Sequence, residues 1–274
     1  MFENQVVWIT GASSGIGEAY AEAFRAEGAR LILSGRRRDA LEALAARLGG
    51  AERCAPLAFE ATAFEALPEI VAQAEAAFGR IDVLVNNAGV SQRSLAQDTA
   101  FEVYRRVIDI DLMAPIALTQ LAAPGMRARG SGRIIAVSSI AGKIGAPLRT
   151  AYCAAKHGVF GYFDALRAEL SGDGIEVHVV APGSVKTDIA RNAMTADGAA
   201  RGESDPAIEA GMAPSEVARI TLAQIKRGKR EIIIAKGRER LIERLRRYAP
   251  EFAFNRIAAM VRQGYVKSIT GDRG

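Results

Sequence analysis

Short runs of valine, isoleucine and leucine alternate with longer amphipathic segments along most of this chain, and this alternation constrains the fold more than any other feature. Such runs predict strands buried on both faces, separated by helices. Right-handed crossovers between successive strands then give an α/β fold with a doubly wound, seven-stranded parallel sheet and helices on both faces. The predicted strands are 6–9, 31–33, 51–58, 83–85, 134–137, 176–180 and 232–234, and the predicted helices are 15–28, 38–48, 64–78, 99–129 and 150–171.

The 274 residues are enough for one large domain with a well-buried core, and no linker-like segment divides them. We therefore expect residues 1–236 to form a single domain. Within it, residues 186–213 are rich in Ala, Gly, Asp and Met with weak periodicity, and we expect a mobile substrate-loop insertion there. Residues 237–274 are predicted to be a helical extension of the same domain, basic and amphipathic over 237–265.

Composition excludes several classes of protein. Charged residues make up 24% and hydrophobic residues 49% of the chain, as in ordinary globular proteins. The net charge of +5 is spread along the sequence, so we expect no nucleic-acid partner. Cys54 and Cys153 are too far apart in the sequence to form a metal-binding pair, so we expect no bound metal. We expect both thiols to be free, as in a reducing compartment, and therefore a cytoplasmic location. Neither a signal peptide nor an apolar run of about 18 residues is expected.

A glycine-rich turn follows the first predicted strand, where residues 10–17 read Thr-Gly-Ala-Ser-Ser-Gly-Ile-Gly. Glycines at this point permit a tight turn and let backbone N–H groups approach a pyrophosphate at the N-terminus of the next helix. An ordinary turn is the alternative, but a strand before and a helix after favour a dinucleotide site. The predicted cofactor-binding residues of this turn are Gly11, Ser13, Ser14, Gly15, Ile16 and Gly17.

The end of the second predicted strand indicates which dinucleotide binds. A site for NAD usually has an acidic residue there to accept a hydrogen bond from the ribose 2′-OH. This chain instead has Arg36, Arg37 and Arg38, with no acid before Asp39. Guanidinium groups bind a 2′-phosphate through paired, charge-assisted bonds. Cations are unfavourable at a helix N-terminus, which argues against a solvated helix start. We therefore expect NADP(H), with Arg36 as the main contact and Arg37 as a secondary one.

Three residues near the fifth predicted strand have the chemistry of a catalytic group. Ser139 follows this strand, at the sheet edge where ligands bind in doubly wound folds. Tyr152 and Lys156 are four residues apart on the next predicted helix, so they share a face. A neighbouring ammonium favours the phenolate form of a tyrosine, which suits it to general acid and base catalysis. Ser139 would stabilise charge on a substrate oxygen, and Lys156 would also hold the nicotinamide ribose.

With these elements in this order, the chain resembles the short-chain dehydrogenase/reductase family over about residues 4–235. The resemblance rests on residues 10–17, the segment Asn86–Gly89, Ser139, Tyr152 with Lys156, and Pro182-Gly183 followed by Thr187. It implies a single-domain Rossmann fold and NAD(P)-dependent interconversion of a carbonyl and a secondary alcohol. The further cofactor-binding residues that it implies are Glu60, Ala61, Asn86, Ala88, Gly89, Pro182, Gly183, Val185 and Thr187. A looser likeness of residues 138–170 to hydroxysteroid-like reductases suggests a bulky hydrophobic substrate, and the family usually forms homodimers or homotetramers.

Asp111 departs from the family pattern, because the family usually has an asparagine at this place on the long middle helix, where it helps to hold a proton-relay water. We include Asp111 among the catalytic residues, since a carboxylate near Lys156 favours the ammonium. The same departure leaves open an alternative function, a non-catalytic NADP-binding sensor or scaffold of the same fold.

The predicted C-terminal extension has two interpretations. Its arginines alternate with apolar residues, as in helices that lie on an anionic membrane surface. A helix that packs its apolar side on the substrate cleft or on a second subunit is the favoured alternative.

Overall fold

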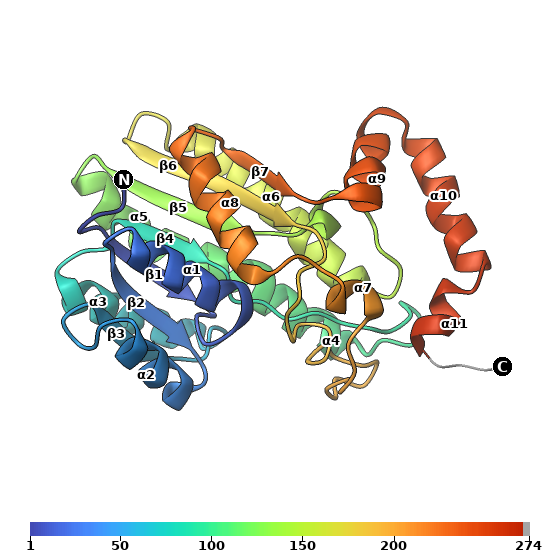
Figure 1. The fold of residues 1–274 in the computed structure, drawn as a ribbon, viewed down its shortest axis with the longest axis horizontal. Coiled ribbons are helices and arrows are strands. Elements are labelled where there is room, and N and C mark those ends of the chain that lie inside the picture. Colours follow the sequence, from blue (N-terminus) through green and yellow to red (C-terminus); the bar gives the residue numbers. More distant parts are fainter. Residues whose placement is uncertain (271–274) are drawn as a thin grey trace.

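In a computed structural model, which describes residues 1–270, seven parallel strands form one sheet in the order β3-β2-β1-β4-β5-β6-β7 (Figure 1). Val7 pairs with Leu31 on one side and with Val83 on the other, so the strand order reverses at the centre of the sheet. This topology confirms the predicted doubly wound Rossmann sheet. The strands are β1 (Val6–Thr10), β2 (Arg30–Gly35), β3 (Cys54–Ala58), β4 (Val83–Asn86), β5 (Gly132–Val137), β6 (Ile175–Pro182) and β7 (Glu231–Ile234).

Helices cover both faces of the sheet. One face packs against α1 (Gly15–Ala26), α2 (Arg38–Arg47) and α8 (Pro214–Lys226), and the other against α3 (Leu67–Phe78), α5 (Ala114–Ala128) and α6 (Thr150–Glu169). Val7 and Ile9 of β1 belong to the first core, whereas Val6 and Trp8 belong to the second. Since successive side chains of a strand point to opposite faces and both faces are buried, the strand is apolar at every position.

Most predicted elements lie within a few residues of the observed ones, but several differ. β3 begins at Cys54 instead of residue 51, because Gly49 and Gly50 form a turn with φ of 115° and 68°. The predicted helix 64–78 begins with a short 3₁₀ turn, η1 (Phe64–Ala66). The sequence analysis missed α8, whose buried Val217 and Leu222 belong to the same core as α1.

The predicted helix 99–129 is divided into α4 (Phe101–Ile108), a π-helical segment η2 (Asp109–Met113) and α5. Pro115 has no N–H to donate to the carbonyl of Asp111, four residues earlier, and regular helical bonding is interrupted beside it. By length and composition the whole stretch Phe101–Ala128 is apolar enough to cross a membrane, contrary to the expectation of no such run. Half of its most apolar window is buried inside the protein, as in the core helix of a globular fold.

Residues 186–213 pack beside the loops at the carboxyl ends of the strands. They contain the short helix α7 (Pro206–Glu209), and Met194 forms an isolated bridge with Gln92. Ala190 and Ala193 are buried as well. The predicted mobility of this segment stays a prediction.

The C-terminal extension forms three helices instead of one continuous helix: α9 (Gly237–Tyr248), α10 (Pro250–Arg262) and α11 (Tyr265–Thr270). Pro250 separates the first two, and the helices form an arm at one end of the molecule, beyond β7 (Figure 1). The exposed large apolar side chains of this arm include Leu241, Tyr248, Phe252, Phe254 and Met260. Residues 271–274 of the predicted extension lie outside the described residues.

Candidate active site

The candidate site is a cleft at the carboxyl ends of β5 and β6. Ser139 follows β5, Tyr152 lies in the first turn of α6, and Pro182 and Val185 lie at the end of β6 and in the loop after it. All four residues line the cleft. The structure therefore brings together the serine, the tyrosine and the Pro-Gly segment that the sequence analysis selected, at the edge where parallel sheets bind ligands.

Gln92, which the sequence analysis missed, holds the N-terminus of α6. Its Oε1 accepts hydrogen bonds from the N–H groups of Ala151 at 3.0 Å and Tyr152 at 3.4 Å, and its Nε2 donates to Oγ1 of Thr150 at 3.2 Å. The first N–H groups of a helix have no partner within the helix, so this buried side chain satisfies two of them. Gln92 thereby orients the turn that carries Tyr152. A glutamine in a loop gives no local signal of such a contact, which joins residues about 60 apart.

Ser139 begins a short 3₁₀ turn, η3 (Ile140–Gly142). Its Oγ accepts a hydrogen bond from the N–H of Ala141 at 3.1 Å and donates a long one to the carbonyl of Pro182 at 3.4 Å. The neighbouring Ser138 donates from Oγ to the carbonyl of Lys156 at 2.9 Å. These bonds join the end of β5 to α6 and fix Ser139 relative to the helix of Tyr152.

Lys156 lies in a buried polar cluster beside Tyr152. Its Nζ donates to the carbonyl of Val137 at 3.0 Å, lies 3.2 Å from Oδ2 of Asp111, and is 5.6 Å from the ring centre of Tyr152. Burial is the largest single influence and disfavours the ammonium, but the charges of Asp111 and Tyr152 and the hydrogen bond to Asp111 together outweigh it, so the pKa of Lys156 is raised. Burial raises the pKa of Asp111, although the Lys156 ammonium and a 2.8 Å hydrogen bond from the N–H of Val90 oppose it.

The glycine-rich turn joins β1 to α1 where no larger residue fits. Gly11 has a φ of +66°, and a Cβ on it would lie 2.8 Å from Cα of Ala88. A Cβ on Gly17 would lie 2.1 Å from the carbonyl oxygen of Gly11. Gly15 also has a positive φ, of 60°. At Gly15 and Gly17 no side chain covers the backbone at the N-terminus of α1, and this cradle fits the pyrophosphate of a dinucleotide.

Asn87, which belongs to the segment Asn86–Gly89 but was not among the predicted cofactor residues, connects this turn to β4. Its Nδ2 donates to the carbonyl of Thr10 at 3.0 Å, and its N–H donates to Oγ1 of Thr10 at 3.0 Å. Asn86, by contrast, donates from Nδ2 to Oγ1 of Thr119 on α5 at 2.9 Å. Oδ1 of Asn86 is buried and has no hydrogen-bond partner among residues 1–270.

Gly89 lies against the ion pair of the site. A Cβ on Gly89 would be 3.1 Å from Oδ2 of Asp111 and 3.4 Å from Nζ of Lys156. The resemblance implies that this glycine binds the cofactor, and the structure shows that it borders the Lys156 cluster.

The two arginines expected to bind a 2′-phosphate follow β2 and differ in their contacts. Arg37 donates from one guanidinium nitrogen to the carbonyl oxygen of Ser13 at 3.0 Å and to its Oγ at 3.1 Å. Arg36 is exposed and has neither a hydrogen bond nor an ion pair within the described part of the chain. The structure therefore places one arginine on the phosphate turn and leaves the other available to a ligand.

The other predicted cofactor residues lie around the same edge of the sheet. Ser14 precedes α1, and Ile16 in the first turn of that helix lines the cleft. Glu60 and Ala61 lie in the loop after β3, where Glu60 accepts a hydrogen bond from Thr62 Oγ1 at 3.3 Å.

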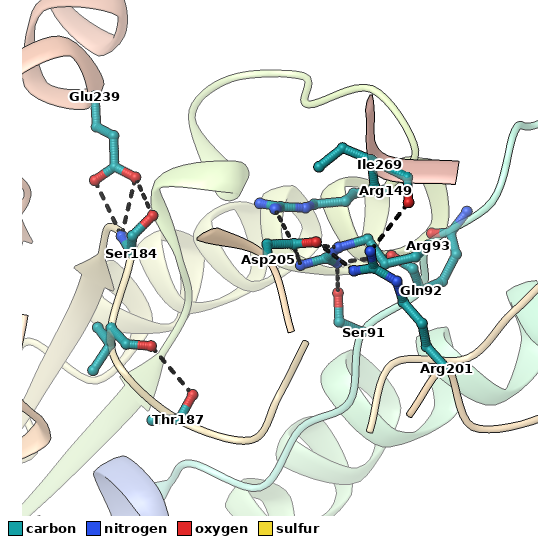
Figure 2. Close-up of polar contacts among 11 residues, drawn as sticks. Ser91, Gln92, Arg93, Arg149, Ser184, Thr187, Arg201, Asp205, Glu239 and Ile269 are labelled. Atoms are coloured by element: carbon teal, nitrogen blue, oxygen red, sulfur yellow. Dashed lines mark hydrogen bonds and ion pairs between the residues drawn. The ribbon is translucent and has the colours of Figure 1, made fainter. Parts of the chain in front are cut away.

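Glu239 of α9 holds the loop that follows β6. Its carboxylate accepts hydrogen bonds from the N–H of Ser184 at 3.1 Å and from the Ser184 hydroxyl at 2.6 Å (Figure 2). A Cβ on Gly183 would lie 2.0 Å from Oε2 of Glu239, so a larger residue there would displace this carboxylate. In the same loop, Thr187 donates to the carbonyl of Val185 at 3.4 Å. The sequence analysis did not identify Glu239, and the start of the C-terminal arm therefore contributes to the site.

Comparison with known proteins agrees with this geometry. A family model described as short chain dehydrogenase matches residues 5–198. "Dehydrogenase/reductase SDR family member 7B" of Bos taurus is 39% identical over 267 residues, which cover 95% of this chain and 82% of that protein. "Dehydrogenase/reductase SDR family protein 7-like" of Drosophila melanogaster is 36% identical over 92% of this chain and 80% of that protein.

Solved structures have the same fold. A short chain dehydrogenase/reductase from Burkholderia phymatum in complex with NAD superposes with a TM-score of 0.81 at 25% identity, covering 92% of this chain and 95% of that one. A metagenomic short-chain oxidoreductase in complex with NADP gives a TM-score of 0.70 at 29% identity, with 85% and 98% covered. The chain therefore belongs to the short-chain dehydrogenase/reductase family of oxidoreductases.

Proposed function

We propose that the protein is an NADP(H)-dependent oxidoreductase that interconverts a carbonyl and a secondary alcohol on a substrate with a hydrophobic part. One observation carries the proposal: Ser139 and Tyr152 line the same cleft, with the Lys156 ammonium 5.6 Å from the ring centre of Tyr152. A protein that only binds a dinucleotide has no use for this arrangement. A nicotinamide cofactor, when bound, supplies or accepts the hydride.

The residues of the site have distinct roles in this reaction. Tyr152 gives a proton to the substrate oxygen in reduction and takes it in oxidation. The Ser139 hydroxyl, whose oxygen already accepts a hydrogen bond from Ala141, donates to the substrate oxygen and stabilises the charge that develops there. Lys156 is held by Asp111 and by the Val137 carbonyl, and it provides a fixed positive charge beside the phenol.

The preference for NADP(H) is supported by the end of β2. Arg37 is bonded to Ser13 of the phosphate turn, Arg36 is exposed, and the first acidic residue, Asp39, already lies in α2. The 2′-phosphate of NADP would neutralise the charges of Arg36 and Arg37, whereas the ribose 2′-OH of NAD would have no carboxylate there to accept its hydrogen bond. The two solved relatives named above contain NAD in one case and NADP in the other, so this preference depends on the residues of this chain.

Titration of the purified protein with NADPH and with NADH, followed by nicotinamide fluorescence, tests the proposal. We expect NADPH to bind at least about tenfold more tightly, the effect of one charge-assisted contact. Hydrophobic ketones and aldehydes are then screened for NADPH oxidation. If NADH binds as tightly as NADPH or more tightly, the proposed binding of a 2′-phosphate by Arg36 and Arg37 is wrong. If neither cofactor binds, the proposed oxidoreductase activity is wrong.

The proposal extends to a cytoplasmic homo-oligomer. Cys54 and Cys153 are both free and buried, as expected in a reducing compartment. Phe101 of α4 and Met113 of η2 are exposed apolar side chains that contact with a second copy would cover. Light scattering on the eluting protein measures the number of subunits, and a monomer at micromolar concentration would contradict this part.

A further inference from the structure

Three arginines surround one aspartate at the side of the cleft away from Glu239 (Figure 2). Asp205 Oδ2 accepts hydrogen bonds from Nε of Arg93 at 2.8 Å and from Arg149 at 3.1 Å, and it lies 2.7 Å from a second nitrogen of Arg93. Arg201 donates to the other carboxylate oxygen. The four residues come from three separate segments of the chain: the loop after β4, the start of α6, and the loop that precedes α7.

The charges of this cluster do not balance. Three guanidinium groups face one carboxylate, which leaves an excess of two positive charges (three minus one) in a site where the Arg93 and Asp205 side chains are only 4% and 2% exposed. Burial lowers the pKa of Arg93, and the charges of Arg149 and Arg201 lower it further. Glu239 is the carboxylate among the lining residues of the cleft, but it is bonded to Ser184 on the opposite side (Figure 2).

The excess charge faces the reacting residues. Arg93 and Arg149 line the same cleft as Ser139 and Tyr152. Arg149 precedes Tyr152 by three residues, so it lies one turn away, at the N-terminus of α6. The positive end of the helix dipole adds to its charge there.

The arginines differ in their free hydrogen-bonding capacity. Arg93 is fully engaged, because it also donates to Ser91 Oγ and to the carbonyl of Gln92, both at 2.8 Å. Arg149 is not, since its Nε is buried and has no hydrogen-bond partner within residues 1–270. Buried N–H groups of this kind are rare in folded proteins. The Arg149 side chain is 20% exposed and lines the cleft, and only one of its guanidinium nitrogens has a hydrogen-bond partner within residues 1–270, so a ligand oxygen in the cleft can accept from its exposed N–H groups.

We propose that the substrate carries an anionic oxygen group, a carboxylate or a phosphate, which binds at Arg149 while its carbonyl lies at Tyr152. This inference rests on the proposed function and narrows its substrate class. Other parts of the lining are apolar, including Ile140, Ile189 and Ile208. The substrate is therefore an amphipathic carbonyl compound or alcohol, with an apolar part and an anionic group, and not a purely hydrophobic one. Arg93 and Arg201 hold the Asp205 carboxylate in place, and Asp205 in turn fixes the position of Arg149.

Binding of inert analogues tests the inference without requiring turnover. Decanoate, decyl phosphate and decanol, each below its micelle concentration, are titrated calorimetrically into the protein with and without saturating NADPH. We expect at least one of the two anions to bind about tenfold to a hundredfold more tightly than decanol, as a hydrogen-bonded charge pair provides. Comparison of decanoate with decyl phosphate tells which oxyanion the site takes.

Two arginine variants separate recognition from structural support. Arg149→Gln should bring the affinity for the anion down to that for decanol and leave decanol binding unchanged, whereas Arg149→Lys should keep part of the preference. Arg219→Gln is the matched control, because Arg219 is exposed on α8 and has no ion pair within the described residues. The control should bind all three ligands as the natural protein does.

The outcomes separate the two proposals. Equal binding of decanol and both anions by the natural protein overturns the anionic site, and the reductase proposal then stands or falls on turnover of neutral ketones. An equal loss of all three ligands in Arg149→Gln also overturns it, since that is the result of a structural clamp. Anion preference in a protein that binds neither NADPH nor NADH supports the anionic site and overturns the reductase.

Discussion

Asp111 and Lys156 form a buried ion pair, with Oδ2 and Nζ 3.2 Å apart, next to the tyrosine that we propose as the proton donor. The pair is held on both sides, since Asp111 also accepts from the Val90 N–H and Lys156 also donates to the Val137 carbonyl. Because the carboxylate raises the pKa of the lysine, it keeps the ammonium charged against the effect of burial.

Asp111→Asn should leave turnover within about tenfold, or roughly 1.4 kcal/mol on the barrier. The amide can still accept the Val90 hydrogen bond, but the pKa of Lys156 should fall because burial is no longer opposed by a carboxylate. The alkaline limb of the kcat profile should therefore move to lower pH. Steady-state kinetics from pH 6 to 10 measure the shift, with the partly exposed Asp109→Asn as control. A loss above a hundredfold at every pH would mean that Asp111 has a direct catalytic role.

Tyr152→Phe should lose about 10²- to 10⁴-fold in turnover, the range for loss of a general acid or base. Cofactor affinity should hardly change, since only the hydroxyl is removed from a side chain that packs at the side of the cleft. Turnover is measured by NADPH oxidation and affinity by fluorescence titration. Tyr162→Phe, on the same helix, serves as the control. A variant that retains full turnover would favour another proton donor, and a natural protein without turnover would favour the NADP sensor.

Arg36→Gln should weaken NADPH binding by about tenfold to a hundredfold, because a charge-assisted bond to the 2′-phosphate is lost. Arg37→Gln should have a smaller effect, since part of its bonding goes to Ser13. NADH binding should stay nearly constant in both. Arg38→Gln is the control, as this arginine faces Glu42 at 3.9 Å. If the variants bind NADH and NADPH more weakly by the same factor, the arginines stabilise the turn and do not bind the 2′-phosphate.

Glu239→Ala should weaken NADPH binding by about threefold to tenfold, because Ser184 loses a charged acceptor and the loop after β6 becomes less ordered. Glu239→Gln, which keeps one acceptor, should have a milder effect. Both are measured by fluorescence titration alongside Glu251→Gln, a control on the exposed side of α10. Unchanged affinity in the alanine variant would restrict the α9 contact to a structural role.

Glu176→Gln should destabilise the protein in a pH-dependent way. Burial favours the neutral acid, but the hydrogen bond and charge of Arg133, with His178 and Arg230 nearby, lower the pKa of Glu176 to about 2. A folded-state pKa below the ordinary value of 4.5 adds stability above that pH, which is lost as the pH falls from about 4.5 to about 2.

The difference in melting temperature between the natural protein and Glu176→Gln should therefore be largest near neutral pH and shrink on acidification. Glu52→Gln, at an exposed glutamate with no ion pair in the described chain, should show no such trend. A difference that stays constant from pH 7 to pH 3 would contradict the lowered pKa.

The sequence by itself determined the seven strands of a doubly wound parallel sheet, the glycine turn, and the places of Ser139, Tyr152 and Lys156 after the fifth strand and on the next helix. These depend on local patterns: a strand buried on both faces is apolar at every residue, and two residues four apart on a helix share a face. The interruption of the helix at Asp109–Met113 could also have been predicted from Pro115. That this interruption is a π-helical segment depends on the side chains that pack around it.

Only the tertiary structure decided which loops meet at the edge of the sheet. Gln92 reaches the N-terminus of α6, Glu239 reaches Ser184, and Arg93 reaches Asp205, 112 residues further along the chain. The periodicity of the sequence does not predict such contacts, because the position of a loop side chain depends on how the helices and strands on either side of the loop pack. The excess positive charge around Asp205 and the unpartnered Nε of Arg149, which indicate an anionic substrate, exist only once those elements have packed together.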